Sequence, residues 1–320
     1  MGLRGFFVTL AAALSLTTAV SPAASVAAEH PVLGTGNGVD HATWLTRSLA
    51  RTSRTFADLG FNVSPVDSYD NGFENGTIFF PDGTYLELFG VHDVGAVASG
   101  PESHAAEGPE GLTWVTIDTS SATDTVNYLK TRGHSLFGPE SLPNPAAWSY
   151  RLAGLEADTL PGRRLYFIEY NDDRVNARRQ ARPETWRVRE THANGAQGLR
   201  SVWVAVRDLA AAENAYRRNG FALGRQIDLP HLQAIGREIP TGDRSIVLVQ
   251  AAHGSSASTL LGSRSAAFIG ASVRVQDLAR ARSIMAESGV TDFPEYIGPY
   301  GRSLLVPPAK AGGSWLELFQ

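Results

Sequence analysis

The segment that decides the fold begins Val39-Asp40-His41-Ala42-Thr43-Trp44, a β-rich run followed by a polar turn. A helix is expected next, from about Leu49 to Leu59, and Gly60 follows it. Ser48 stands where an N-cap residue belongs, and Gly60 stands where a left-handed residue ends a helix. The segment therefore predicts a strand, a helix and then further strands.

The same pattern recurs three more times along the chain. His41 lies 19 residues before Gly60, and two later segments, Ser201 to Gly220 and Gly270 to Gly289, repeat that spacing. The remaining segment, Thr113 to Gly133, spans 20 residues. Repeated spacing of this kind is typical of an internally duplicated fold. The sequence therefore predicts four βαβββ modules.

The last strand of three modules carries a glutamate. Glu87 lies 46 residues after His41, and Glu317 lies 47 residues after Gly270, each in a Leu-Glu-Leu triplet. The second module ends in Leu165–Tyr170, which contains Glu169. The last strand of the third module has no acidic residue at that place.

A carboxylate on the aromatic face of a strand needs a partner. Because strands alternate faces, Tyr85, Glu87 and Phe89 share one side. A buried carboxylate is costly unless it is paired, hydrogen-bonded or bound to a metal. His41 lies in the first strand of the same module, and a histidine with carboxylates can hold a divalent cation. Pairing with arginine is the alternative, with Arg178 or Arg179 of the connector for Glu169 and Arg302 for Glu317.

Composition excludes several classes of protein. The chain has 320 residues, enough for two ordinary domains, with a net charge of −4 and 43 % hydrophobic residues. That balance argues against a partner made of nucleic acid, which needs a basic footprint. Cysteine is absent, so disulfides, thiolate metal sites, iron–sulfur clusters and a cysteine nucleophile are excluded.

Residues 1–28 are typical of a signal peptide. Arg4 supplies a positive start, an apolar stretch runs from Gly5 to Val20, and Val26-Ala27-Ala28 offers a cleavage site. We therefore expect a secreted or periplasmic protein that has no membrane segment after cleavage. An uncleaved membrane anchor is the alternative.

The chain resembles the glyoxalase-like domain proteins of the vicinal oxygen chelate superfamily. The resemblance rests on the module that begins at Val39, on Tyr166-Phe167-Ile168-Glu169-Tyr170, and on Thr191-His192-Ala193-Asn194-Gly195-Ala196. It implies the α+β fold of glyoxalases, bleomycin resistance proteins and dioxygenases, in which modules pair into cupped mixed sheets. The expected halves are 38–185 and 198–320. We interpret His192 as a turn residue.

The resemblance also implies one divalent metal, which is nickel, zinc, manganese or iron. The matching positions are His41, Glu87 and Glu169, with Thr113 at the place of a fourth ligand. If the first module pairs with the fourth instead, Glu317 replaces Glu169. A single histidine at these positions counts against ring cleavage by iron.

Two functions follow from the resemblance. The first is a metal-dependent lyase or isomerase that acts on a small molecule with vicinal oxygens, with Glu87 or Glu169 moving a proton. The second is a metal-free protein that sequesters a small molecule by stacking on Trp44, Tyr85 and Trp315. A monomer or a homodimer is expected.

Overall fold

The computed structural model describes residues 30–70, 72–93, 97, 109–141, 150–156, 160–161, 165–170, 183–291 and 293–320. The predicted signal peptide, residues 1–28, and both Arg178 and Arg179 lie outside the described residues. Within the described ranges, no helix combines the length and the apolar character needed to cross a membrane.

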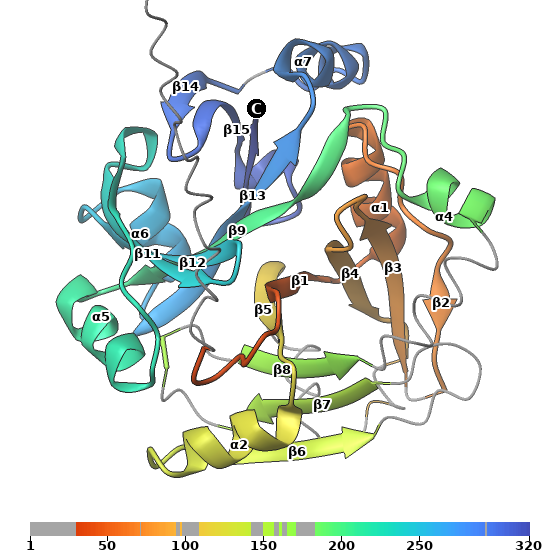
Figure 1. Ribbon diagram of the computed structural model, residues 1–320. Helices are drawn as coiled ribbons and strands as arrows, with labels where there is room; N and C mark the ends of the chain where they lie inside the picture. The colour runs from red at the N-terminus through yellow and green to blue at the C-terminus, as the bar shows by residue number, and fades with distance from the viewer. Residues whose placement is uncertain are drawn as a thin grey trace, which may run out of the picture.

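The first two modules share one eight-stranded mixed sheet (Figure 1). The strands of the first module are β1 (Gly38–Thr46), β2 (Asp67–Ser68), β3 (Phe73–Phe79) and β4 (Tyr85–Val91). Those of the second are β5 (Gly111–Asp118), β6 (Leu136–Ser141), β7 (Tyr150–Leu155) and β8 (Leu165–Tyr170). Their order is β2-β3-β4-β1-β5-β8-β7-β6, so β1 and β5 join the two modules at the centre.

The third and fourth modules form a second sheet with the equivalent strand order, β10-β11-β12-β9-β13-β16-β15-β14. The third module contributes β9 (Ala196–Val206), β10 (Gln226–Leu229), β11 (Ala234–Thr241) and β12 (Arg244–Ala251). The fourth contributes β13 (Ala266–Val275), β14 (Glu295–Gly298), β15 (Gly301–Val306) and β16 (Trp315–Phe319). The predicted α+β fold of four paired modules is confirmed, and pairing of the first module with the fourth is ruled out.

One helix in each module follows the first strand. These helices are α1 (Leu49–Asp58), α2 (Ala122–Lys130), α5 (Leu209–Arg218) and α7 (Leu278–Glu287). Their N-caps are Ser48, Ser121, Asp208 and Asp277, and each cap side chain accepts a backbone N–H of the first turn. The other short helices are α4 (Pro183–Arg189), α6 (Ser256–Leu261), η2 (Pro230–Leu232) and η3 (Pro308–Lys310).

The caps correct the alignment of the second module. His41 lies seven residues before Ser48, and the residue seven before Ser121 is Trp114. Thr113 is displaced by a β-bulge in β5, at the point where the pairing of β1 with β5 shifts register. The counterpart of His41 is therefore Trp114 and not Thr113.

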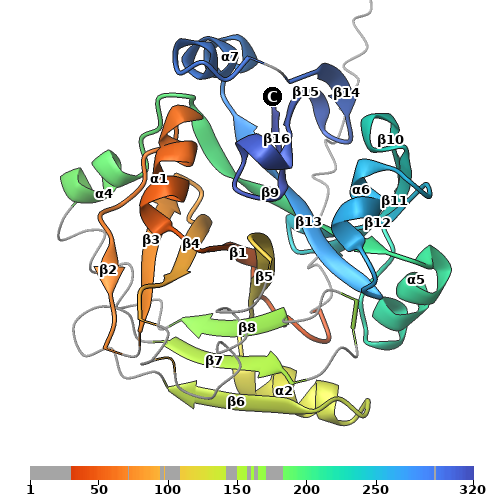
Figure 2. The same ribbon diagram turned by 180° about the vertical axis from the view of Figure 1, so that it is seen from behind.

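The two faces of each sheet have different neighbours. On β9, Val202 and Val204 belong to the main core, which also includes Phe56 of α1 and spans both halves. The alternate residue Trp203 belongs to a second cluster with Leu261 of α6. We call the side of each sheet away from the module helices its concave face. In the second sheet α6 packs on this face, against β9 and β13 (Figure 2).

His192 links the two halves. Its Nδ1 atom accepts a hydrogen bond from the backbone N–H of Asn62 at 3.0 Å, and its Nε2 atom donates to the carbonyl of Phe79 at 2.9 Å. Two residues later, Asn194 donates its side-chain amide to the carbonyl of Leu59. The residue that we interpreted as a turn residue is thus a buried connection between the first module and β9.

We predict that His192 makes the fold sensitive to acid. Burial lowers the pKa of its imidazole from the usual 6.5, so the folded protein favours the neutral ring. The stability that neutral His192 contributes to the fold is complete above pH about 6.5. It is lost as the pH falls from there through the lower pKa of the folded state. Gln can make the same two contacts without titrating. In urea unfolding, His192→Gln should therefore lose less stability than wild type between pH 7 and pH 5. An equal loss in both proteins would contradict this role.

Candidate functional site

A β-bulge in β1 brings Asp40 and His41 to the same side of the sheet. The pairing of β1 with β5 shifts register between Val39 and His41, so the usual alternation fails at Asp40. Asp40 Oδ2 lies 2.6 Å from His41 Nδ1. Because a carboxylate only accepts, the Nδ1 atom carries the proton of this hydrogen bond. Sequence reasoning missed Asp40, because alternation would place it on the opposite face from His41.

Two tyrosines complete the surroundings of this pair. The Tyr170 hydroxyl donates to Asp40 Oδ2 at 2.9 Å, and the Tyr85 ring stacks on His41 with centroids 4.2 Å apart. Burial, followed by the charge of Asp40, raises the pKa of Tyr85 and Tyr170 well above the usual value. Both phenols therefore stay protonated, and Tyr170 remains a donor.

His41 offers one ring nitrogen to a ligand. Its side chain is 9 % exposed, and Asp40 occupies Nδ1. Nε2 has no hydrogen-bond partner among the residues that the structure describes. With the proton fixed on Nδ1, neutral His41 presents a lone pair at Nε2, which is the form that a base or a metal ligand requires.

Glu87 lies on the same face as His41, on the neighbouring strand. The parallel pairing of β1 with β4 sets His41 beside Tyr85 and Thr43 beside Glu87. The Thr43 hydroxyl and the Asn75 amide each donate to the Glu87 carboxylate at 3.0 Å. The structure therefore brings together two of the predicted site residues, His41 and Glu87. Both of the carboxylate's contacts are neutral donors.

Glu169 lies on the other face of the sheet. On β8 the concave face is occupied by Tyr166 and Tyr170, which alternate with Glu169. The Glu169 carboxylate accepts the backbone N–H of Ala122 at 2.8 Å, at the start of α2, and lies 3.5 Å from Arg151. The structure does not bring Glu169 to His41 and Glu87. Its partner is Arg151 of the same sheet, whereas the sequence suggested a connector arginine.

Tyr166 occupies the place that corresponds to Glu87. Thr43 pairs with Glu87, and its counterpart Thr116 pairs with Tyr166. Trp114 and Tyr166 also pack in one small cluster, with Phe89 of β4. The second module thus contributes aromatic rings to the concave face where the first module contributes an imidazole and a carboxylate.

This arrangement agrees with the comparison to protein families. The model of a family described as a glyoxalase-like domain matches residues 39–220, which is more than half of the chain. The chain belongs to the glyoxalase-like domain family. No curated protein sequence matches it.

Solved structures of low identity share the fold. A hypothetical protein from Staphylococcus aureus is 12 % identical with a TM-score of 0.58, covering 88 % of this chain and 98 % of its own. 4-Hydroxymandelate synthase from Streptomyces coelicolor, solved as a mutant, is 12 % identical with a TM-score of 0.56, covering 88 % and 92 %. A variant of homoprotocatechuate 2,3-dioxygenase from B. fuscum is 12 % identical with a TM-score of 0.59, covering 92 % and 73 %. At this identity the likeness shows the fold alone.

In this glyoxalase-like chain the described donors do not match a three-ligand metal site. Within the described ranges, no group of three or more His, Asp or Glu side chains could hold a metal ion. His41 and Glu87 are two donors, and the corresponding places in the second module carry Trp114 and Tyr166. A protein metal site with open positions usually has three protein ligands. We therefore derive no chemical step through a metal.

Glu317 is enclosed in the second sheet. It is fully buried and accepts hydrogen bonds from the hydroxyls of Ser272 and Tyr296, both at 2.6 Å. Burial raises the pKa of this carboxyl, although the hydroxyls oppose the shift. It lies in a different sheet from His41, so it does not replace Glu169 in the site.

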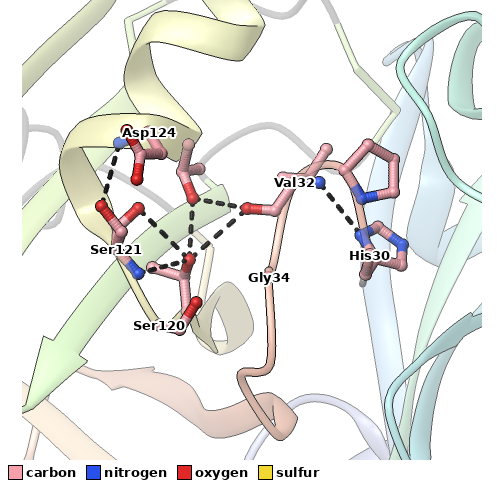
Figure 3. Close-up of a pocket in the computed structure, with 9 residues that line it drawn as sticks. His30, Val32, Gly34, Ser120, Ser121 and Asp124 are labelled. Carbon is pink, nitrogen blue, oxygen red and sulfur yellow. Dashed lines mark hydrogen bonds between the residues drawn. The ribbon is translucent and has the colours of Figure 1, made fainter. Parts of the chain in front are cut away.

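A cavity of about 210 Å³ lies on the α2 side of the first sheet. In Figure 3, His30 and Val32 border it on one side, and Ser120, Ser121 and Asp124 border it on the other. Ser121 is the N-cap of α2, and the next residue is the one that Glu169 binds. The cavity is therefore separated from His41 and Glu87 by the sheet.

We predict that Glu169 stabilises α2 and does not act at His41. Glu169→Ala removes the acceptor of a helix N-terminal N–H, which costs about 1 kcal/mol in comparable caps. Urea unfolding should show that loss, whereas Glu169→Gln, which keeps an acceptor oxygen, should lose less. A stable Glu169→Ala protein that no longer binds or turns over a ligand of the concave face would contradict this assignment.

Proposed function

We propose that this glyoxalase-like chain is a lyase or isomerase that transfers a proton on a small molecule bound at the concave face of the first sheet, with His41 as the base. The observation that carries the proposal is the pair of hydrogen bonds that Tyr170 and His41 Nδ1 donate to Asp40, which leaves Nε2 without a hydrogen-bond partner among the described residues. A carboxylate that fixes the tautomer of a histidine and stabilises its protonated form is a recurrent means of making a base.

The proton transfer would run as follows. Nε2 of His41 takes a proton from a carbon next to a carbonyl group. The electron pair of the C–H bond forms the C=C bond of an enolate, and the π pair of the carbonyl moves onto its oxygen. Asp40 stabilises the resulting imidazolium by its negative charge at 2.6 Å. The proton then returns to a different atom of the substrate in an isomerase, or the enolate expels a leaving group in a lyase.

Glu87 and Tyr69 would position the substrate. Thr43 and Asn75 hold the Glu87 carboxylate in place and leave lone pairs that accept a substrate hydroxyl. Burial, and then the charge of Glu87, raises the pKa of Tyr69, so its phenol is a donor. Tyr69 is 43 % exposed, so a ligand can reach it. A phenol donor at such a place can stabilise a developing enolate oxygen.

The proposal includes export of the protein, and it allows a divalent metal to bind without requiring one for the proton transfer. A chelated divalent ion would find His41 Nε2 and Glu87 as its donors among the described residues, and the proton transfer above does not use it. Export rests on residues 1–28 of the sequence. Capture of a small molecule without turnover is the alternative function, and the aromatic residues Trp114 and Tyr166 favour it.

We predict that His41 governs exchange of a substrate C–H proton with solvent. A panel of hydroxy-carbonyl and dicarbonyl compounds would be incubated with the protein in D2O, and deuterium incorporation followed by ¹H NMR. Loss of a general base lowers rates by about 10²–10⁴-fold, so His41→Gln should fall by that factor. Asp40→Asn should exchange more slowly and with a shifted pH profile, because it alters the histidine through its tautomer.

Glu169→Gln is the matched control, since it changes a carboxylate on the opposite face of the same sheet. It should exchange at the wild-type rate. Exchange that persists in His41→Gln would contradict the proposal. Tight binding of a compound that is recovered unexchanged would favour the sequestering protein.

A further inference from the structure

We infer that the ligand of the concave face of the first sheet carries a positive charge, as in an amine or a quaternary ammonium group. This inference rests on the proposed function, which places the site at His41 and Glu87. It adds the charge of the molecule that binds there.

The strands of the first sheet are strongly acidic. Their one arginine or lysine is Arg151, which lies beside Glu169 on the face away from His41. Their carboxylates are Asp40, Asp67, Glu74, Glu87, Asp118, Glu140 and Glu169. Among the strand residues that the structure describes, Asp40 and Glu87 bring negative charge to the His41 side of the sheet, and no strand arginine or lysine lies on that side.

The second sheet differs, although it has the same topology. Its strands contain the arginines Arg200, Arg237, Arg244, Arg274 and Arg302. Its acidic residues are Asp228, Glu238, Glu295 and Glu317. Glu238 shows the contrast, because Arg200 and Arg225 both contact its carboxylate. The acidic excess is therefore a property of the first sheet and not of the fold.

Asp40 contacts His41 and Glu87 lies on the same face, and among the described residues only neutral or histidine donors bond these two carboxylates. Asp40 accepts from His41 and Tyr170, and Glu87 accepts from Thr43 and Asn75. No arginine or lysine of the described ranges pairs with either carboxylate. Partly buried carboxylates are stabilised by a positive charge nearby, and a bound cation would supply it.

Aromatic rings border the same region. Tyr85 stacks on His41, and Tyr69 lies near enough to Glu87 for the carboxylate charge to raise the pKa of its phenol. The negative face of an aromatic ring attracts ammonium groups, most strongly where water is excluded. The His41 side chain is 9 % exposed, and its Nε2 atom has no hydrogen-bond partner among the described residues, which is a second, independent sign that a ligand belongs here. Acidic groups and tyrosine rings together select a cation over a neutral molecule of the same shape.

The test compares three probes of one shape and different charge. These are choline, its neutral isostere 3,3-dimethylbutan-1-ol, and the anion 3,3-dimethylbutanoate. Each would be titrated into the full chain and followed by protein ¹⁵N–¹H chemical shifts. We expect choline to bind about tenfold tighter than the neutral isostere, with the anion weakest. Added salt should reduce the preference.

Two variants locate the effect. Glu87→Gln should bring the affinities of choline and its isostere close to parity, whereas Glu169→Gln, on the other face, should keep the preference. Equal affinities in wild type, a preference for the anion, absence of saturable choline binding, or a preference untouched by Glu87→Gln would each overturn the inference. A choline preference without proton exchange on any substrate would remove the proposed function and leave this inference in place.

Discussion

The hydrogen bond between Asp40 and His41 depends on a bulge, and the candidate site depends on that hydrogen bond. In a regular strand these neighbours would face opposite sides, and His41 would have no carboxylate within reach. The extra residue in β1 places both side chains together at 2.6 Å. The proton is then held on Nδ1, and Nε2 is left for a ligand. Tyr170 reaches Asp40 from β8, so the second module supports a residue of the first.

The same bulge has a counterpart in the second sheet with different chemistry. The pairing of β9 with β13 shifts register between Leu199 and Ser201, which isolates Arg200 in the place of Asp40. Ser201 stands in the place of His41 and bonds the Ser272 hydroxyl. In the second sheet α6 packs on the concave face, and the polar groups of that face bond one another, as Ser272 and Tyr296 do with Glu317. One duplicated framework thus carries different side chains at the equivalent places of its two halves.

Much of the fold could be predicted from the sequence because it depends on local signals. The N-caps Ser48 and Ser121 and the glycines that end the helices repeat at fixed spacing, and they fix four modules. His41 and Glu87 could be placed together because β1 and β4 pair in parallel within one module. Bulges are not visible in residue spacing. For this reason the sequence alignment set Thr113, and not Trp114, at the place of His41, and Asp40 was missed.

Glu169 shows a second limit of sequence reasoning. Alternation correctly separates it from Tyr166 and Tyr170, but which side faces the helices depends on packing across the whole sheet. A carboxylate at the end of a strand can act as a site residue or as an acceptor for the first N–H groups of a helix, and Glu169 does the second for α2. His192 is similar, because its two backbone partners lie far away in sequence, at Asn62 and Phe79. Such contacts exist only once the halves are assembled.

The tautomer of His41 tests the central claim most directly. Long-range ¹H–¹⁵N NMR correlations of the imidazole report which nitrogen carries the proton in the neutral ring. The structure predicts the Nδ1–H form with an unprotonated Nε2, and a mixture of tautomers in Asp40→Asn. A neutral His41 protonated on Nε2, or a ring that does not respond to Asp40→Asn, would contradict the account.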